Sequence, residues 1–432
     1  MTNMPMTKAL AQFSLLESPD QSALSVLQLS LLDWLTVAIA GKQEPVAGSV
    51  RALAVEEAGK EQSSLVGSPL KVPARMAAMV NGTIGHALDY DDTHFAHIGH
   101  PSTVILPAVL AVGQAIGADG KSVQEAGLIG VEASIRVGLW LGRGHYQVGF
   151  HQTATAGAFG AALGCARLLG LDEQRTQEVI GLCATRASGL KSQFGTMAKP
   201  FNAGMAAANG VEAALLVMHG LQPKVDGLET LQGFGETHHG EADLTALENL
   251  GQDWQFSQVN HKFHACCHGL HAALEAFAPL RGRAGEIEEV RVETNPRWLR
   301  VCNIAEPRDG LECKFSYAQV LAMAAHNQDT ARTESYTEAC ATDPELKSFR
   351  SKVSVFGDDR VSETASRLVV KRMNGSEVVL EHDLASPMSF DERRAKVMEK
   401  SRALLGAEMA DVLWGKVSGF ASPDEIGSVI SQ

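Results

Sequence analysis

Apolar residues recur at every third or fourth position through most of the first 220 residues, which is the spacing of one face of an α-helix. The segment 23–39 follows this spacing closely. Ser122 and Glu125 form a capping box, which predicts a helix over 122–141. A third helix is expected over 154–169. The pattern therefore predicts a large, entirely helical domain in the first part of the chain.

The periodicity changes after about residue 258. Residues 286–294 alternate charged and β-branched side chains, as a half-exposed strand does. Two further strands are expected over 366–371 and 377–380, and the Asn374-Gly375 pair between them is a strong hairpin signal. This region is therefore expected to form a smaller domain of mixed helix and strand.

A second capping box, Ser389 with Glu392, marks the return to helical sequence near the C-terminus. We therefore expect a mainly α fold with two domains: an all-helical domain over 1–258 and 394–432, and an α+β lid domain over 259–393. Crossing points between such domains are common places for a ligand cleft.

The composition narrows the classes of function. Lys and Arg total 37 against 50 Asp and Glu, so the formal net charge is −13 and nucleic acid is not expected as a partner. No apolar run approaches the roughly 18 residues of a membrane span, and the first residues lack the pattern of a secretory signal. The seven cysteines are scattered, which is typical of reduced thiols in a cytoplasmic protein.

The densest polar segment runs from His86 to His100 and holds three carboxylates and four histidines among glycine and proline. One interpretation is a loop that binds and protonates a substrate. A second is a divalent-metal site using Asp91, Asp92 and a histidine. A third is helix capping by Asp89 or Asp92 with solvated histidines.

Two later segments add candidate groups in helical sequence. Thr153 is placed to cap the helix that follows it, so His151 is expected near a positive helix N-terminus, which lowers the pKa of a histidine. A buried histidine bonded to backbone is the alternative. Lys199 lies in an otherwise uncharged Gly/Ala/Met stretch before Pro200, so we expect its ammonium to meet an anion.

Residues 261–271 contain six potential zinc ligands, and in a helix His264, His268 and His271 would share one face. No Cys-x-x-Cys pair accompanies them, so a metal is the less favoured interpretation and Lys262 the favoured functional residue. Tyr317 is a further candidate, with a core tyrosine whose hydroxyl is bonded as the alternative.

Several of these segments together resemble the MmgE/PrpD family, which includes 2-methylcitrate dehydratase, cis-aconitate decarboxylase and iminodisuccinate epimerase. The resemblance rests on motifs in family order: "NGTIGHALDYDDTH", "GHPSTVILPAVLAVGQ", "GFHQTATAGAFGAA", "GTMAKPFNAGMAAANG", "KFHACCHG" and "KFSYAQVLA". It implies a helical domain with an α+β lid, a homodimer, and no metal or organic cofactor.

The resemblance also implies the site residues. The catalytic set is His100, His151, Asp89 and Tyr317, and the substrate-binding set is Lys199, Lys262, Thr93 and His100. The stretch between Thr93 and the His-Pro pair is about one residue longer than in the decarboxylase, which leaves His97 as the alternative to His100. Gln152 stands where many members have a His-Pro pair.

The chemistry of these residues suits a multiply charged acid. Each lysine can neutralise one carboxylate of a di- or tricarboxylate, and a histidine can then move a proton next to that carboxylate. The resulting carbanion-like species can lose hydroxide, lose CO₂ or be reprotonated from the opposite face.

The first hypothesis is therefore a cofactor-independent lyase, a hydro-lyase similar to 2-methylcitrate dehydratase. The alternatives on the same fold are an epimerase or isomerase of an amino-dicarboxylate such as iminodisuccinate, and a carboxy-lyase similar to cis-aconitate decarboxylase. A metal-dependent enzyme using Asp91 and Asp92 or the His/Cys cluster, and a non-catalytic binding protein, are the hypotheses from other classes.

Overall fold

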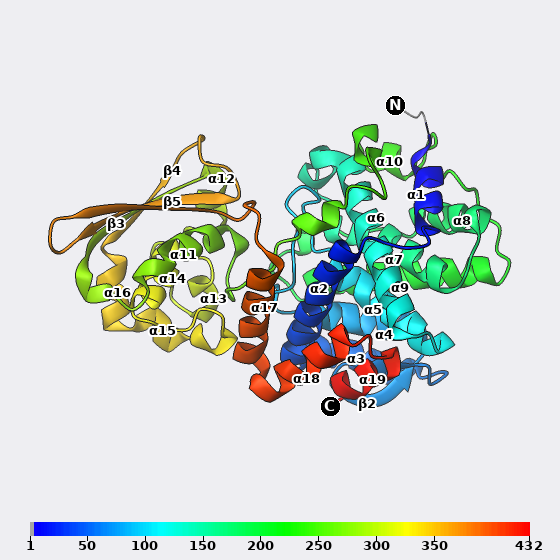
Figure 1. Cartoon of the computed structure of the whole chain (residues 1–432), viewed down its shortest axis with the longest axis horizontal. Helices are drawn as coiled ribbons and strands as arrows, with labels where there is room; N and C mark the ends of the chain where they lie inside the picture. The colour runs from blue at the N-terminus through cyan, green and yellow to red at the C-terminus, as the bar shows by residue number, and fades with distance from the viewer. Residues whose placement is uncertain (1–3) are drawn as a thin grey trace. The chain divides into compact units, whose positions relative to one another are not determined.

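A computed structural model describes residues 4–432 of the chain, and these form two units. The first unit contains the described residues up to His261 together with Leu405–Gln432, and the second contains Lys262–Leu404. Figure 1 shows the elements of both along the chain.

The first unit is helical apart from one short hairpin. Its central helices are α4 (Ala74–Gly85), α5 (Ser102–Ile116), α7 (Gln152–Leu168) and α9 (Ala198–Met218), which pack against one another. Around them lie α1 (Met6–Ser14), α2 (Gln21–Ala40), α3 (Pro45–Glu57), α6 (Gly120–Gln147), α8 (Glu173–Ala184), α10 (Phe234–Thr237), α18 (Ala407–Ser418), α19 (Pro423–Ile430) and the hairpin β1 (Ser63–Leu65) with β2 (Ser68–Val72).

Glycines allow the central helices to approach closely. A Cβ atom on Gly204 of α9 would lie only 2.1 Å from the Thr83 hydroxyl and 2.2 Å from the Met79 carbonyl oxygen of α4. Likewise, a Cβ atom on Gly160 of α7 would lie 2.4 Å from the Gly130 carbonyl oxygen of α6. Because backbone meets backbone at these points, the ends of the helices have fixed positions relative to one another.

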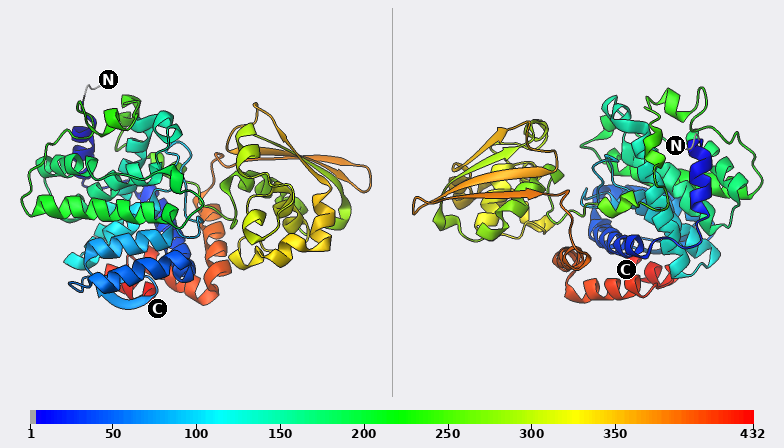
Figure 2. Two further views of the ribbon diagram at one scale, coloured as in Figure 1. Left: turned by 180° about the vertical axis from the view of Figure 1, so that it is seen from behind. Right: turned by 45° about the horizontal axis from the view of Figure 1, so that its top comes forward.

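The second unit contains a four-stranded sheet in the order β4 (Val353–Gly357), β3 (Ile287–Thr294), β5 (Ala365–Arg372) and β6 (Glu377–Asp383). β4 is parallel to β3, and the other pairs are antiparallel. Figure 2 shows helices gathered on one face of this sheet. The helices of the unit are α11 (His271–Phe277), α12 (Pro296–Val301), α13 (Gly310–Cys313), α14 (Tyr317–Ala325), α15 (Glu338–Thr342), α16 (Pro344–Arg350) and α17 (Phe390–Leu405).

The predicted mainly α class is confirmed, and the strands expected in the later region are present, with the hairpin turn at Asn374-Gly375. The capping box of Ser389 with Glu392 also forms, at the start of α17. The expected box at Ser122 does not form. Asp119 instead accepts the backbone N–H of Ser122, so α6 begins earlier, at Gly120.

The boundary expected at 394 differs from the division seen in the structure, because α17 groups with the second unit. The Lys396 ammonium lies 2.5 Å from the Glu275 carboxylate of α11 and 5.1 Å from the Phe263 ring centre. These contacts hold the helix to the second unit, and the chain returns to the first unit after Leu404.

Two stretches pass the length and composition test for a membrane span, although no uninterrupted apolar run was found in the sequence. They are Gln21–Gln43 and Ala198–Met218. In each, most of the 18-residue apolar segment is buried inside the protein, 78% in the first and 61% in the second. The sequence analysis did not identify them because single polar residues, such as Gln28 and Asp33, interrupt the first apolar run, although its mean hydropathy stays high. Buried core helices pass the same test, so this is weak evidence for a membrane.

Candidate active site

Four central helices bring their ends to one place in the first unit. His86 follows the last residue of α4, and Ser102 begins α5. His151 is the N-cap of α7, and Lys199 lies in the first turn of α9. Three of the four ends are N-termini of helices of 15 to 21 residues, whose backbone N–H groups and dipoles favour negative charge. The local field therefore suits an anion, although the whole chain is acidic.

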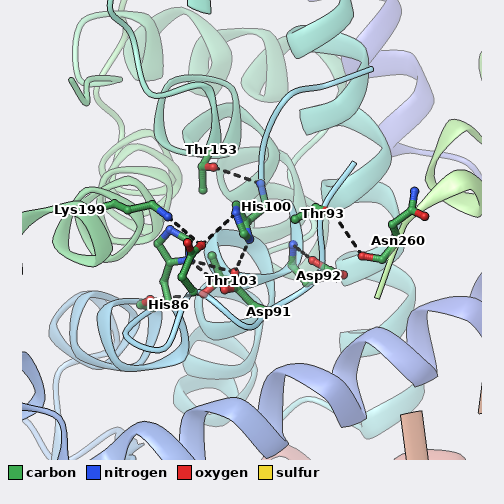
Figure 3. Close-up of polar contacts among 12 residues, drawn as sticks. His86, Asp91, Asp92, Thr93, His100, Thr103, Thr153, Lys199 and Asn260 are labelled. Carbon is green, nitrogen blue, oxygen red and sulfur yellow. Dashed lines mark hydrogen bonds and ion pairs between the residues drawn. The ribbon is translucent and has the colours of Figure 1, made fainter. Parts of the chain in front are cut away.

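The polar loop, residues 86–101, joins α4 to α5 and supplies the centre of the site (Figure 3). The Asp91 carboxylate lies between two histidines: Oδ1 is 2.9 Å from His86 Nδ1, and Oδ2 is 3.1 Å from His100 Nδ1. His100 Nε2 lies 3.3 Å from Asp89 Oδ1. The loop therefore holds two carboxylates and two imidazoles in mutual contact.

The backbone of the polar loop enters the left-handed region at two positions. Asp89 and Ile98 have φ angles of +51° and +54°, in the left-handed region. An aspartate adopts this conformation readily, whereas for a β-branched isoleucine it is a genuine outlier. Strain of this kind persists where surrounding contacts impose it, and it is concentrated at functional sites. At Asp89 the turn directs the carboxylate toward His100 and Lys199.

Lys199 meets an anion, as the sequence predicted. Its Nζ atom lies 2.7 Å from Asp89 Oδ1, and its side chain is only 17% exposed. The Phe194 ring lies 5.4 Å from the same ammonium and 4.9 Å from the His151 ring. Lys199 and His151 therefore share one aromatic neighbour and lie on the same side of the site.

His151 is buried, and several positive groups surround it. Burial, followed by the charges of His86, Lys199 and His100, lowers the pKa of His151 well below its ordinary value. The side-chain amide of Asn202 donates to His151 Nδ1 at 3.3 Å. The imidazole is therefore neutral near pH 7 and has the protonation state of a base.

The predicted lowering of the His151 pKa is confirmed, but two details of the prediction are wrong. The expected cause was the helix N-terminus, whereas burial is the first cause and neighbouring charges follow it. His151 itself is the N-cap of α7, without a side-chain bond to the helix. The hydroxyl of Thr153 instead accepts the backbone N–H of His100 at 3.1 Å (Figure 3), so Thr153 fixes the polar loop rather than the helix end.

Asp92 is turned away from this cluster and stabilises the start of α5. Its carboxylate accepts the backbone N–H and the hydroxyl of Ser102. Burial and the nearby Asp33 and Asp91 carboxylates raise the pKa of Asp92 to about 7, although the Ser102 hydroxyl opposes this shift. This arrangement agrees with the helix-capping interpretation of Asp92.

Thr93 joins the polar loop to the end of the first unit. It exchanges two backbone hydrogen bonds with Asn260, of 2.8 and 2.7 Å, and its hydroxyl lies 3.4 Å from the Asn260 carbonyl oxygen (Figure 3). Asn260 stands two positions before Lys262 in the sequence. The Thr93 hydroxyl is thus directed at backbone, and its predicted contact with substrate stays a prediction.

The structure separates the two histidines that were alternatives for one role. His100 contacts Asp89 and Asp91. The His97 ring is fully buried beside Gly138, where a Cβ atom would lie 2.1 Å from Nδ1, and neither ring nitrogen has a hydrogen-bond partner in the described part of the chain. Burial lowers the pKa of His97 to about 3, so it is a neutral core residue and His100 belongs to the site.

One geometric observation is consistent with a metal site in the polar loop. One donor atom each from His86, Asp89, Asp91 and His100 all lie within 4.8 Å of one another, the one such group among residues 4–432. Asp92, one of the ligands first considered, is not a member. The Lys199 ammonium already lies 2.7 Å from Asp89, and its positive charge opposes a cation there. This contact therefore disfavours the metal interpretation of the cluster.

The remaining candidates belong to the second unit. Lys262 is its first residue and is buried. The Tyr317 hydroxyl donates to the Gly269 carbonyl at 2.6 Å and lies 3.0 Å from the Thr294 hydroxyl, and burial raises its pKa. These contacts are those of a core tyrosine, so a catalytic role for Tyr317 rests on the resemblance alone.

Residues 261–271 do not form the continuous helix considered for zinc binding, because α11 begins only at His271. The His264 and His268 rings still lie 5.1 and 4.9 Å from the His271 ring. Within residues 4–432, however, these histidines do not bring three ligand atoms as close together as the polar loop does. The structure thus gives the zinc interpretation no support.

Sequence reasoning assigned no role to three side chains that line the cluster, and it considered a fourth, Asp91, only as a metal ligand. His86 and Asp91 stood in the quoted motif, and the density of polar residues there was the available signal. Asn202 stood in the motif of Lys199, three positions later on the same helix. Phe194 precedes that helix in a loop, where periodicity carries no information.

Comparisons with known proteins agree with the motifs. Residues 8–247 match the model of the MmgE/PrpD N-terminal domain, and residues 264–412 match that of the MmgE/PrpD C-terminal domain. A cis-aconitate decarboxylase of Aspergillus terreus is 27% identical over 387 residues, which are 79% of this chain and 77% of that protein.

Other relatives match over shorter regions. A cis-aconitate decarboxylase from Aspergillus terreus strain NIH 2624 is 30% identical over 52% of this chain and 49% of its own length. The human cis-aconitate decarboxylase is 31% identical over 46% of this chain and 43% of its own length. These two matches thus span about half the length of the relatives.

Proposed function

This chain belongs to the MmgE/PrpD family, and we propose that it is a cofactor-independent lyase that moves a proton next to a carboxylate of a di- or tricarboxylic acid. Membership of the family and the decarboxylase relatives support a carboxylate-acting lyase. The particular acid and the bond that breaks are part of the proposal.

One observation carries the proposal: three helix N-termini, the Lys199 ammonium and a neutral His151 meet at one place. The N-termini and the ammonium favour a substrate carboxylate. A proton next to that carboxylate becomes easier to remove when the developing negative charge meets fixed positive groups. The neutral imidazole of His151, whose pKa is lowered by burial and by its positive neighbours, supplies the base.

Asp89 has two roles in this scheme. It neutralises Lys199, so that a nearly buried ammonium is not left without a counter-charge. When a substrate carboxylate takes its place at Lys199, Asp89 still faces His100 Nε2 and orients that ring. His100 then returns a proton to the substrate or to its leaving group.

Lys262, Thr93 and Tyr317 complete the proposal on the basis of the family resemblance. Lys262 would bind a second carboxylate, Thr93 would hold a substrate oxygen, and Tyr317 would assist proton transfer. For Tyr317 this requires that its hydroxyl exchange the Gly269 carbonyl for the substrate. Variants of each residue test these roles separately.

The choice of reaction rests on sequence rather than on geometry. A hydro-lyase of the 2-methylcitrate dehydratase type is the first candidate. The relatives named cis-aconitate decarboxylase favour loss of CO₂ as the second. An epimerase of an amino-dicarboxylate such as iminodisuccinate shares the same first step. We also propose a homodimer in the cytoplasm, with no nucleic acid or membrane as partner.

Proton NMR in D₂O tests the proposal. Purified protein is incubated separately with 2-methylcitrate, cis-aconitate and amino-dicarboxylates, with a His151→Gln variant as control. New alkene signals from 2-methylcitrate indicate dehydration. Conversion of the cis-aconitate signals to those of an acid with one carboxylate fewer indicates decarboxylation, and deuterium at the α-position of an amino-dicarboxylate with inverted configuration indicates epimerisation. Absence of all three, at enzyme concentrations that detect one turnover per hour, would refute the proposed function.

A further inference from the structure

The Asp91 carboxylate is shared by two imidazoles. His86 donates its Nδ1 proton to both oxygens, at 2.9 and 3.0 Å, and His100 Nδ1 lies 3.1 Å from Oδ2 (Figure 3). The Asp91 and His86 side chains are fully buried, and that of His100 is 12% exposed. Three side chains from one loop thus form a chain in the order His86, Asp91 and His100.

This carboxylate is ionised despite its burial. Burial alone raises the pKa of Asp91, but the charges and hydrogen bonds of His100 and His86 outweigh it, and the pKa lies well below its ordinary value. A buried carboxylate is costly unless it is paired and hydrogen-bonded. Asp91 therefore depends on a proton at Nδ1 of each neighbouring ring.

The position of that proton determines what His100 can do. A ring that keeps one proton at Nδ1 takes up and gives its second proton at Nε2. Nε2 of His100 is the atom that faces Asp89 at 3.3 Å, next to Lys199. His100 Nδ1 itself lies within hydrogen-bond distance of Asp91 Oδ2, at 3.1 Å.

His86 holds the other side of the carboxylate. Its ring packs 4.7 Å from the His100 ring and 6.0 Å from the His151 ring. Its Nδ1 is committed to Asp91, while its buried Nε2 has no hydrogen-bond partner in the described residues. His86 thus fixes the position of the Asp91 carboxylate.

We propose that Asp91 is a positioning residue, anchored by His86, that selects Nε2 of His100 as the atom that transfers the substrate proton. This inference rests on the proposed function, in which His100 is the proton donor. It adds the reason why His100 has the correct tautomer: a negative charge behind the ring holds the other nitrogen protonated.

Asp92 provides a matched control. It is the next residue and also a buried aspartate, but its carboxylate binds Ser102 rather than a histidine. The experiment compares Asp91→Asn and Asp92→Asn in the full chain. The first removes the charge behind His100 and keeps the shape, whereas the second alters a helix cap outside the chain of three residues. Circular dichroism and thermal unfolding establish that both variants are folded.

Two readouts are measured at several pH values. In steady-state kinetics, we expect Asp91→Asn to lower kcat at least tenfold and to change KM less than threefold, with a changed pH profile, while Asp92→Asn keeps kcat within threefold. Asp91→Glu should restore part of kcat. In spectra of ¹⁵N-histidine-labelled protein, the His100 signal, assigned by its absence in His100→Gln, should show the Nδ1-protonated tautomer only when Asp91 is a carboxylate.

An unchanged His100 tautomer in Asp91→Asn would overturn the inference. Equal losses of kcat in the two Asn variants would do so as well, because that result indicates a merely structural role. If the wild-type protein turns over none of the acids, the proposed function fails. The NMR comparison then still decides whether Asp91 controls the His100 ring, so the two failures can be told apart.

Discussion

Nζ of Lys199 lies 2.7 Å from Oδ1 of Asp89, so the ammonium expected to bind substrate is paired with a carboxylate of the protein itself. The two residues come from different elements: the first turn of α9 and the strained backbone of the polar loop. The pair shows what a substrate carboxylate has to replace. It also explains how an isolated lysine is tolerated in an apolar segment.

Replacing Lys199 with methionine removes the charge and keeps most of the side-chain length. We expect kcat/KM to fall by about 10- to 100-fold, the effect of losing one hydrogen bond to a charged group. Lys71→Met is the matched control, since Lys71 forms an exposed pair with Asp424 in the same unit. Steady-state kinetics on the accepted acid measure both variants. Wild-type kcat/KM in Lys199→Met would show that Lys199 does not bind substrate.

The two histidines of the polar loop should respond in opposite ways to substitution. His97→Leu is expected to keep activity at pH 7, because neither nitrogen of the His97 ring has a hydrogen-bond partner in the described residues. His100→Gln is expected to lower kcat by 100-fold or more. Activity assays on both folded variants decide the assignment. A loss confined to His97→Leu would reverse it.

His97→Leu should also reduce acid sensitivity. Burial lowers the pKa of His97 from 6.5 to about 3. Its contribution to the free energy of unfolding is therefore fully present above pH 6.5 and is lost as the pH falls toward 3. Between pH 7 and pH 4.5 this loss should lower the free energy of unfolding of the wild type by on the order of 2 kcal/mol, and the variant should not show it. Urea unfolding of wild type and variant at pH 7 and pH 4.5 measures the difference. An equal loss in both proteins would contradict this prediction.

The sequence allowed prediction of the elements, because these depend on local patterns, whereas the site residues were implied by the family resemblance. Helical spacing and the Asn374-Gly375 turn are read directly from neighbouring residues. The contact of Lys199 with Asp89 was expected only as a lysine meeting some anion. Its partner could not be named, because the close approach of α4 and α9 at Gly204 determines which loop lies next to Lys199.

The different roles of residues in the polar loop could not be predicted from the sequence, because they too depend on the path of the backbone. His86 and Asp91 are five positions apart, a spacing that places side chains together in neither a helix nor a strand. The positive φ of Asp89 turns the backbone between them. Similarly, Asp91 and Asp92 are adjacent in sequence, yet one contacts histidines and the other caps α5. Only the path of the backbone distinguishes the two carboxylates.

Metal removal tests whether the four clustered donor atoms of the polar loop bind a metal ion. We expect activity to persist after exhaustive dialysis against EDTA, because Lys199 and the helix N-termini supply the positive charge that a metal would otherwise provide. Turnover is measured before and after dialysis, with total metal determined by mass spectrometry. Loss of activity that Zn²⁺ or Mg²⁺ restores would favour a metal site at His86, Asp89, Asp91 and His100.

Asp92 is expected to make stability depend on pH in the direction opposite to His97. Its pKa is raised from 3.8 to about 7. The contribution of Asp92 to the free energy of unfolding is therefore fully present below pH 3.8 and is lost as the pH rises through 7. Asp92→Asn remains neutral at every pH. Between pH 5 and pH 8 the variant should gain on the order of 2 kcal/mol relative to wild type. Urea unfolding at both pH values measures this gain, and a constant difference would contradict the raised pKa.

The close approach of α4 and α9 can be tested with one methyl group. Gly204→Ala would place its Cβ atom 2.1 Å from the Thr83 hydroxyl and 2.2 Å from the Met79 carbonyl oxygen. We expect a loss of about 1–3 kcal/mol or more, because the Met79 carbonyl belongs to the helix backbone and cannot move aside as a side chain can. Since Lys199 lies in the first turn of the same helix, KM should rise as well.

Gly415→Ala in α18 is the control for Gly204→Ala, because its new Cβ atom would have no neighbour within 4 Å. An alanine in an open helical position should stabilise the protein by up to about 1 kcal/mol. Thermal unfolding of both variants measures the contrast, and kinetics measure KM. If Gly204→Ala were as stable as Gly415→Ala, contact between the two backbones would not be what positions Lys199 against Asp89.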